Sequence, residues 1–238
     1  ASDERSTKLR FHTQTGGSTL TAQQPENNIV RVALQGFAAV CGGTQSLHTN
    51  GFDEALALPS ERAAKLALRT QQVIAYESGA TDTVDPFAGS YFVEALTDEI
   101  ETSARELIAK VDELGGSINA IDFIKNEIEE SAFGYHERYR IGQDIVVGVN
   151  KFVEDDPEVP DILRVDPESE RQQVERLKAF KADRDAEVVE RRLEEVRGAA
   201  RGTDNLLPVL REALKDRCTL GEVCAAMRDV FGEYQPTF

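Results

Sequence analysis

The stretch that decides the fold runs from Leu9 to Pro59 and reads LRFHTQTGGSTLTAQQPENNIVRVALQGFAAVCGGTQSLHTNGFDEALALP. It contains two short strand-like runs, at residues 8–15 and 43–50, with a helical pattern between them. Each run ends in polar residues such as histidine, glutamine, threonine and asparagine. In α/β barrels, strand ends of this kind carry binding and chemistry. We therefore expect the functional residues in this stretch, and mostly scaffold in the rest of the chain.

The segment between the two runs is typical of an amphipathic helix. Pro25 suits a first helical turn, and Gly42 with Gly43 suits the end of the helix. Between these points, apolar residues keep helical spacing at Val30, Ala33, Leu34, Phe37 and Cys41.

A second helix follows the second run. Residues 53–58 predict a helical turn that Pro59 stops, and Ser60 to Ser78 predict a long helix closed by Gly79. Crossovers of this length between two strands predict that the strands are parallel. The expected fold class is therefore α/β.

Helices dominate after Gly79. Residues 82–90 are irregular, and a one-sided apolar stripe then predicts a long helix that ends at Gly115 and Gly116. The members of this stripe are Leu96, Ile100, Ala104, Leu107, Val111 and Leu114. A second stripe follows at Ile118, Ile121, Ile124 and Ile128.

The last third of the chain is highly charged. Two β-branched runs between residues 144 and 165 flank the segment EDDPEVPD and predict a crossing strand or an extended linker. Helical spacing returns from Glu168, and Arg191 with Arg192 and the neighbouring glutamates predicts a solvated helix face. Thr219 and Glu222 form a capping-box pair ahead of the last helix.

Composition restricts the class of protein. The 238 residues are 40% hydrophobic, which is enough for a packed core. A net charge of −16, from 43 acidic and 27 basic residues, argues against nucleic acid or an anionic membrane as partner. No apolar run approaches the roughly 18 residues of a membrane span, and no signal peptide is evident, so we expect a cytoplasmic protein. Ala1 and a single methionine lead us to expect a processed chain or a segment of a longer polypeptide.

Motifs for familiar chemistry are absent from the sequence. The three cysteines have no C-x-x-C spacing and the three histidines are far apart, so we expect no protein-held metal. The sequence from Gly16 to Thr19 is a weak candidate for a phosphate cradle and more often a strand-to-helix turn. We interpret the adjacent carboxylates Asp53 and Glu54 as helix-surface charge and not as an acid/base pair.

Several separated blocks of the sequence nevertheless match one family in order. They are RFHTQTGGSTLTAQQPENN, GGTQSLHTNGFDEALALP, QQVIAYESG, DPFAGSYFVEALT, GVNKF and TLGEVCAAMRDVFGEY. Together, from about Lys8 to the end, the chain resembles the large, substrate-binding subunit of methylmalonyl-CoA mutases, in its C-terminal part and without the cobalamin-binding domain.

The resemblance implies a fold and a reaction. In that family a (β/α)8 TIM barrel binds acyl-CoA along its axis and meets adenosylcobalamin, which a flavodoxin-like domain carries. The cofactor supplies the radical chemistry, and the barrel supplies polar positioning groups and excludes water. The implied reaction is the isomerisation of (R)-methylmalonyl-CoA to succinyl-CoA. The mutases of isobutyryl-CoA, 2-hydroxyisobutyryl-CoA and ethylmalonyl-CoA share these blocks, and a non-catalytic assembly module for the mutase complex is a further alternative.

The resemblance also implies roles for residues of the first run. It places His12 and Gln14 at the end of the seventh barrel strand, with Gln14 towards the corrin. His12 is either a catalytic-site neighbour of the cofactor or a satisfied structural histidine.

The second run would supply the other contacts. Gln45 and Ser46 would face the pantetheine chain of coenzyme A, and Asn50 and Glu54 would face the adenosyl ribose. Ala55 and Leu58 would pack on the corrin. Without the resemblance, Glu54 is interpreted as first-turn helix charge.

Parts of the family pattern are missing from this chain. We expect residues 1–90 to hold the last βα units of the barrel and residues 91–238 a helical extension and linker region. The earlier strands, which bring most substrate contacts, have no counterpart, and neither does the D-x-H-x-x-G motif that ligates cobalt. The expected partners are therefore the N-terminal part of the barrel and a cobalamin-binding subunit or domain, in a hetero-oligomer.

Overall fold

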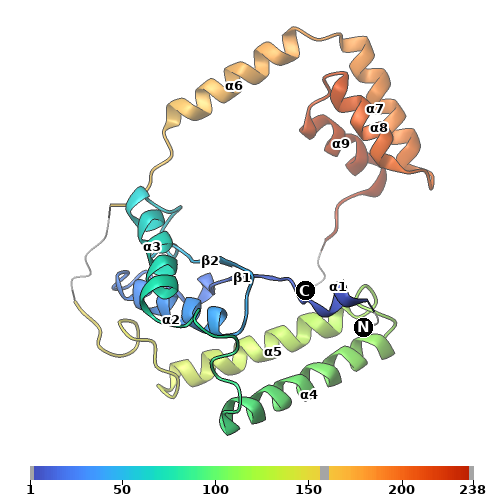
Figure 1. Ribbon diagram of the computed structural model, residues 1–238. Coiled ribbons are helices and arrows are strands. Elements are labelled where there is room, and N and C mark those ends of the chain that lie inside the picture. Colours follow the sequence, from blue (N-terminus) through green and yellow to red (C-terminus); the bar gives the residue numbers. More distant parts are fainter. Residues whose placement is uncertain (1–2, 156–160, 236–238) are drawn as a thin grey trace. The chain divides into compact units, whose positions relative to one another are not determined.

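The structure is a computed structural model that describes residues 3–155 and 161–235. The chain divides into two compact units, residues 1–164 and 165–238 (Figure 1). The described part is mostly helical and contains one small parallel sheet, which is compatible with the expected α/β class. None of its helices is long and apolar enough to cross a membrane.

The sheet in the first unit consists of β1 (His12–Gln14) and β2 (Ser46–His48). The strands are parallel, as predicted, and pair His12 with Ser46, Thr13 with Leu47 and Gln14 with His48. Both strands are shorter than the predicted runs, because each has a single neighbour in the described residues and the residues beyond the paired ones have no ladder to join.

Two helices cover one face of this sheet. They are α2 (Asn27–Cys41) and α3 (Glu61–Glu77), which pack against each other. The predicted end of α2 and both ends of α3 are confirmed, since Gly42 caps α2, Ser60 caps the start of α3, and Gly79 follows α3 with φ of +72°. The predicted start of α2 is not, because the helix begins at Asn27 and Pro25 lies before its first turn. Gly36 allows the close approach of the two helices, because a Cβ there would lie 3.2 Å from Cδ1 of Ile74.

The strands alternate between the helix side and the opposite face. Thr13 and Leu47 are half-buried on the side of α2 and α3, whereas the strand residues before and after them are exposed. The exposed set is polar and consists of His12, Gln14, Ser46 and His48.

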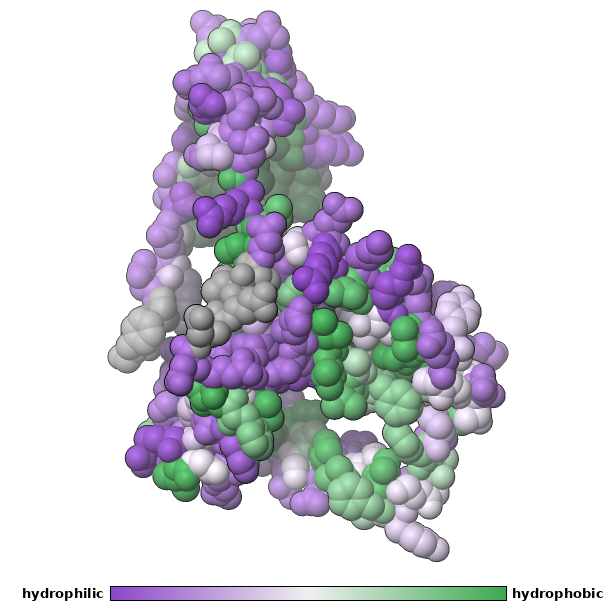
Figure 2. All heavy atoms as spheres, turned by 90° about the vertical axis from the view of Figure 1, so that its left-hand side faces the viewer, coloured by the Kyte–Doolittle hydropathy of each residue, from purple (hydrophilic) through white to green (hydrophobic). Residues whose placement is uncertain are grey.

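The remaining elements of the first unit leave much apolar surface exposed. They are α1 (Glu4–Thr7), the 3-10 turn η1 (Gly17–Thr19), α4 (Tyr91–Glu113) and α5 (Ile121–Arg140). The predicted stripe on α4 stays in solvent, with Ile100 at 61% and Leu107 at 51% exposed, and α4 and α5 contain no buried residue. Groups of apolar atoms are visible among polar ones on the face drawn in Figure 2.

The predicted crossing strand or linker at 144–165 is a loop in its first part. Residues 144–153 contain one isolated bridge, between Val147 and Lys151, and no named strand. Most of the segment EDDPEVPD lies outside the described residues.

The second unit contains four helices in its described residues: α6 (Pro167–Ala182), α7 (Ala186–Ala200), α8 (Leu206–Lys215) and α9 (Leu220–Phe231). The helices α7, α8 and α9 enclose a core of Val189, Leu193, Val196, Ala213, Cys218, Val223 and Ala226. The capping box of Thr219 and Glu222 is present as predicted. The interpretation of α7 as a solvated face was incomplete, because its other face forms this core.

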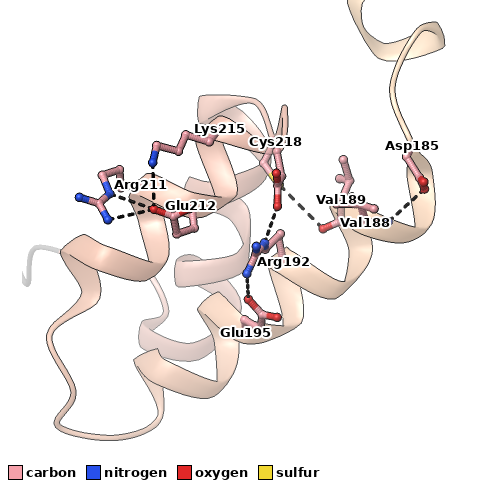
Figure 3. Close-up of polar contacts among 10 residues, drawn as sticks. Asp185, Val188, Val189, Arg192, Glu195, Arg211, Glu212, Lys215 and Cys218 are labelled. Atoms are coloured by element: carbon pink, nitrogen blue, oxygen red, sulfur yellow. Dashed lines mark hydrogen bonds and ion pairs between the residues drawn. The ribbon is translucent and has the colours of Figure 1, made fainter.

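Charged side chains brace this core at its surface. Arg192 of α7 contacts Asp216 and Glu195, both at 2.7 Å (Figure 3). Hydrogen bonds to these two carboxylates raise the pKa of Arg192. The thiol of Cys218 is buried, and this burial raises its pKa.

Candidate functional site

The ends of the two strands are joined by polar contacts. The side-chain amide of Gln14 donates to Oδ1 of Asn50 at 3.2 Å. The backbone N–H of Asn50 donates to Oγ1 of Thr15 at 3.0 Å, and the N–H of Thr15 donates to the carbonyl of His48 at 3.0 Å. The structure therefore brings Gln14 and Asn50 together, which the sequence expectation assigned to one cofactor.

Asn50 is the most constrained residue of this group. It is 2% exposed, and its Nδ2 has no hydrogen-bond partner among the described residues. Buried donors are almost always paired in folded proteins, so such an atom is suited to a ligand or to another part of the protein.

Gly17 and Glu54 lie beside the unpaired amide. A Cβ at Gly17 would lie 2.8 Å from Nδ2 of Asn50 and 3.1 Å from Oε1 of Glu54. Because Gly17 has no side chain, an amide donor and a carboxylate acceptor can both approach its Cα closely. Glu54 is exposed, and no hydrogen bond or ion pair holds its carboxylate in the described part of the chain. A donor and an acceptor so close together can bind neighbouring hydroxyl groups.

Asp53 differs from its neighbour Glu54. It is fully buried, its Oδ2 accepts from the N–H of Ser60 at 2.9 Å, and its Oδ1 has no partner among the described residues. The interpretation of both carboxylates as surface charge is therefore wrong for Asp53. Sequence reasoning missed it because an aspartate next to a glutamate at the start of a short turn gives no sign of its burial.

The turn that carries these carboxylates follows β2 directly. The N–H groups of Leu56 and Ala57 bond to the carbonyl of Asp53 at 2.8 and 3.1 Å, as a helical turn requires. Ala55 and Leu58 lie on this turn, and both are exposed, Leu58 at 63%. They are free to pack against an apolar surface.

Gln45 and Ser46 lie at the other end of β2. The side chain of Gln45 accepts from the N–H of Phe11 at 2.8 Å and donates to the carbonyl of Gly43 at 2.8 Å. Oγ of Ser46 is 2.8 Å from Nδ1 of His12, on the exposed face. In this structure Gln45 connects the residues that precede the two strands, and His12 has Ser46 as its hydrogen-bond partner.

His48 lies beside the candidate site, and the sequence predictions did not include it. It pairs with Gln14 in register and lies on the same exposed face as Ser46, two residues before Asn50. The signal in the sequence was the alternation of Ser46 and His48, which puts both on one face of a strand. The described residues contain no cluster of side chains that would hold a metal ion.

Comparison with known proteins identifies the family. The family model described as methylmalonyl-CoA mutase matches residues 1–233. The chain is 43% identical over 234 residues to a protein named probable methylmalonyl-CoA mutase, mitochondrial, of Caenorhabditis elegans, covering 97% of this chain and 32% of the relative. It is 44% identical over 237 residues to the mitochondrial methylmalonyl-CoA mutase of Bos taurus, covering 98% of this chain and 32% of the relative.

A relative with another printed substrate is nearly as similar. The chain is 41% identical over 241 residues to the 2-hydroxyisobutanoyl-CoA mutase large subunit of Aquincola tertiaricarbonis, covering 100% of this chain and 43% of the relative. Measured against the first two relatives, the chain spans about a third of their length. It belongs to the methylmalonyl-CoA mutase family and corresponds to part of the large subunit of these mutases.

Proposed function

We propose that this chain forms the last βα units of a (β/α)8 barrel, in residues 1–90, and a helical extension, in residues 91–238, of an adenosylcobalamin-dependent acyl-CoA mutase. The proposed reaction is the interconversion of (R)-methylmalonyl-CoA and succinyl-CoA. The observation that carries the proposal is the convergence of Asn50 Nδ2 and Glu54 Oε1 over the bare Cα of Gly17. It lies at the carboxyl ends of parallel strands, where barrels place their active sites.

The residues present fit the adenosyl part of the cofactor. The unpaired amide of Asn50 would donate to one ribose hydroxyl, and the exposed carboxylate of Glu54 would accept from a hydroxyl. Gln14, which already donates to Asn50, would orient that amide and face the corrin. Ala55 and Leu58 would add apolar contact on the corrin and help to exclude water. When bound, adenosylcobalamin supplies the radical that abstracts hydrogen from the substrate.

The exposed face of the sheet fits a barrel interior. Ser46 and Gln45 at the start of β2 would contact the pantetheine chain, while His12, through its bond to Ser46, would hold that hydroxyl in place. Polar side chains that bind and orient substrate match a reaction that needs no strong protein acid or base. The cobalt ligand would come from a cobalamin-binding domain or subunit, and the other barrel strands from the rest of the large subunit. The cytoplasmic location stays a prediction.

A second candidate substrate is a 2-hydroxyacyl-CoA, because the chain is also 41% identical, over its whole length, to the 2-hydroxyisobutanoyl-CoA mutase subunit. Turnover of each acyl-CoA by the complete protein separates the two candidates.

The experiment that tests the site uses the complete mutase that contains this segment, loaded with adenosylcobalamin. Glu54→Gln removes the carboxylate and should raise the KM for adenosylcobalamin about tenfold, the effect of losing one charged hydrogen bond of about 1.4 kcal/mol. The KM for methylmalonyl-CoA should stay the same.

The matched control is Glu77→Gln, an exposed carboxylate near the end of α3 with no contact to the turn. An unchanged KM for adenosylcobalamin in Glu54→Gln would remove Glu54 from the site. Absence of acyl-CoA turnover in the unmutated, loaded protein would overturn the proposed function itself.

A further inference from the structure

The loop at residues 144–153 is built around one side chain. Oδ1 of Asn150 accepts from the N–H of Val146 at 2.8 Å, and its Nδ2 donates to the carbonyl of Asp144 at 2.8 Å and of Tyr139 at 3.2 Å. The amide of Asn150 therefore ties the loop to itself and to the end of α5. A loop held in this way has a defined shape and can act as a rigid contact surface.

This loop lies against the start of α2, more than a hundred residues earlier in the chain. Nη2 of Arg31 donates to the carbonyl of Val147 at 2.7 Å. The amide of Gln24 donates to the carbonyl of Phe152 at 2.9 Å. The contact is close, since a Cβ at Gly148 would lie 2.9 Å from Oε1 of Gln24.

Arg31 also hydrogen-bonds a buried asparagine, Asn28. Its Nη1 donates to Oδ1 of Asn28 at 2.7 Å and to Oγ1 of Thr21 at 3.0 Å. Asn28 is 0% exposed, and its Oδ1 also accepts from the N–H of Thr21 at 3.1 Å. A guanidinium can make these bonds and the bond to Val147 at once because its donors form a rigid fork.

Asn28 connects the segments that follow the two strands. Its Nδ2 donates to the carbonyl of Thr21, after β1, and to the carbonyl of Phe52, after β2, both at 2.8 Å. Phe52 lies midway between Asn50 and Glu54 in the sequence and is 4% exposed. The position of residues 50–54, which include both proposed ribose contacts, thus depends on Asn28.

We propose that Asn28, Arg31 and the loop at 144–153 form a brace that positions the Asn50–Glu54 turn for the adenosyl group. These are positioning residues, because none of them reaches the cradle formed by Asn50, Glu54 and Gly17. The brace connects the loop at 144–153, which belongs to the extension, to residues 50–54. The extension therefore controls the affinity for the adenosyl group. The identity of the ligand rests on the proposed function, whereas the brace itself is a set of contacts in this chain.

The test compares two cobalamins that differ in the group the brace serves. The complete mutase with Arg31→Lys keeps the positive charge, but one ammonium cannot span Val147, Asn28 and Thr21. We expect the Kd for adenosylcobalamin to rise about tenfold, the size of one lost charge-assisted hydrogen bond, and the Kd for hydroxocobalamin, which lacks the adenosyl group, to stay unchanged. Arg69→Lys is the control, since Arg69 is an exposed residue of α3 bonded to Gln72.

A second variant and a readout without cofactor make the result decisive. Gln24→Asn suits the positive φ of 44° at this position but is too short to reach Phe152, so it should reproduce the selective loss. In the cofactor-free protein, both variants should speed amide hydrogen exchange in residues 50–57 and leave α7 to α9 unchanged.

Equal weakening of both cobalamins, or unchanged exchange at residues 50–57, would overturn the brace. Failure of the unmutated protein to prefer adenosylcobalamin would instead overturn the proposed function, while faster exchange in the variants would still support the brace as a structural element.

Discussion

Two regions of the molecule differ in how they bury their side chains. One is the bundle of α7, α8 and α9, and the other is the strand unit of β1, β2, α2 and α3. The bundle closes its own core, with Val196, Ala213 and Ala226 each at 0% exposed. The strand unit buries one face of its sheet on two helices and leaves the other face polar and open. The most buried large side chains there include polar ones, Asn28, Asn50 and Asp53.

The difference teaches where stability and function are located in this chain. A closed apolar core makes the bundle stable through hydrophobic burial, which needs no outside partner. The strand unit instead keeps unpaired polar atoms, Asn50 Nδ2 and Asp53 Oδ1, at its strand ends. Unpaired buried atoms cost free energy, and they are retained where a ligand or another part of the protein supplies the partner.

The largest expected effect is at the centre of the bundle. Val196→Asp places a carboxylate where the side chain is 0% exposed, and it should destabilise the bundle by more than about 4 kcal/mol because the buried charge has no partner. Far-UV circular dichroism during thermal unfolding of the chain should show the loss of the bundle transition.

Leu207→Asp is the matched control, since Leu207 of α8 is 72% exposed and in the first turn, where a carboxylate suits the helix dipole. Its unfolding should change by less than about 0.5 kcal/mol. Equal effects of the two substitutions would show that α7 to α9 do not form a closed core.

A smaller effect, with a pH dependence, is expected at the start of α9. Arg184 hydrogen-bonds Glu222 at 2.6 Å, and Lys181 lies 3.3 Å from the same carboxylate. The bond from Arg184 holds the pKa of Glu222 well below its usual range. Glu222→Gln should therefore cost about 2 kcal/mol at neutral pH, as for a charged hydrogen bond in a partly buried pair.

The sign of the pH effect follows from the lowered pKa. Stabilisation by Glu222 is fully present above the pKa of an unfolded glutamate, about 4.3, and is lost as pH falls towards the folded pKa. The difference in unfolding free energy between the unmutated chain and Glu222→Gln should be constant near neutral pH and shrink in acid. A difference that grows in acid would contradict the assignment.

Local signals in the sequence predicted much of the framework. Gly43, Gly79 and the pair Thr219 and Glu222 marked helix ends, because left-handed or capping positions accept few residue types. The helix α8 was not predicted, because Pro208 within its first turn interrupts the pattern although proline is tolerated there.

Contacts over long sequence distances were beyond sequence reasoning. Family resemblance pointed to Asn50 and Glu54, but only the structure shows the unpaired amide and the close approach of both side chains to Gly17. The bond from Arg31 to Val147 joins residues that no periodic pattern relates. The alternation that puts His48 beside Gln14 was visible, but the strand register that pairs them was not.

The smallest expected effect concerns the exposed stripe of α4. Ile100 is 61% exposed, so Ile100→Gln removes little buried surface, and glutamine is a good helix former. In the chain by itself, the unfolding free energy should change by less than about 0.5 kcal/mol in denaturant titrations. In the complete mutase, the same substitution should cost more than about 1 kcal/mol if another segment covers this stripe, since full burial of an isoleucine contributes about 1.5–3 kcal/mol. If Ile100→Gln lowers the unfolding free energy of the complete protein no more than that of the chain, the stripe stays exposed to solvent in the complete mutase as well.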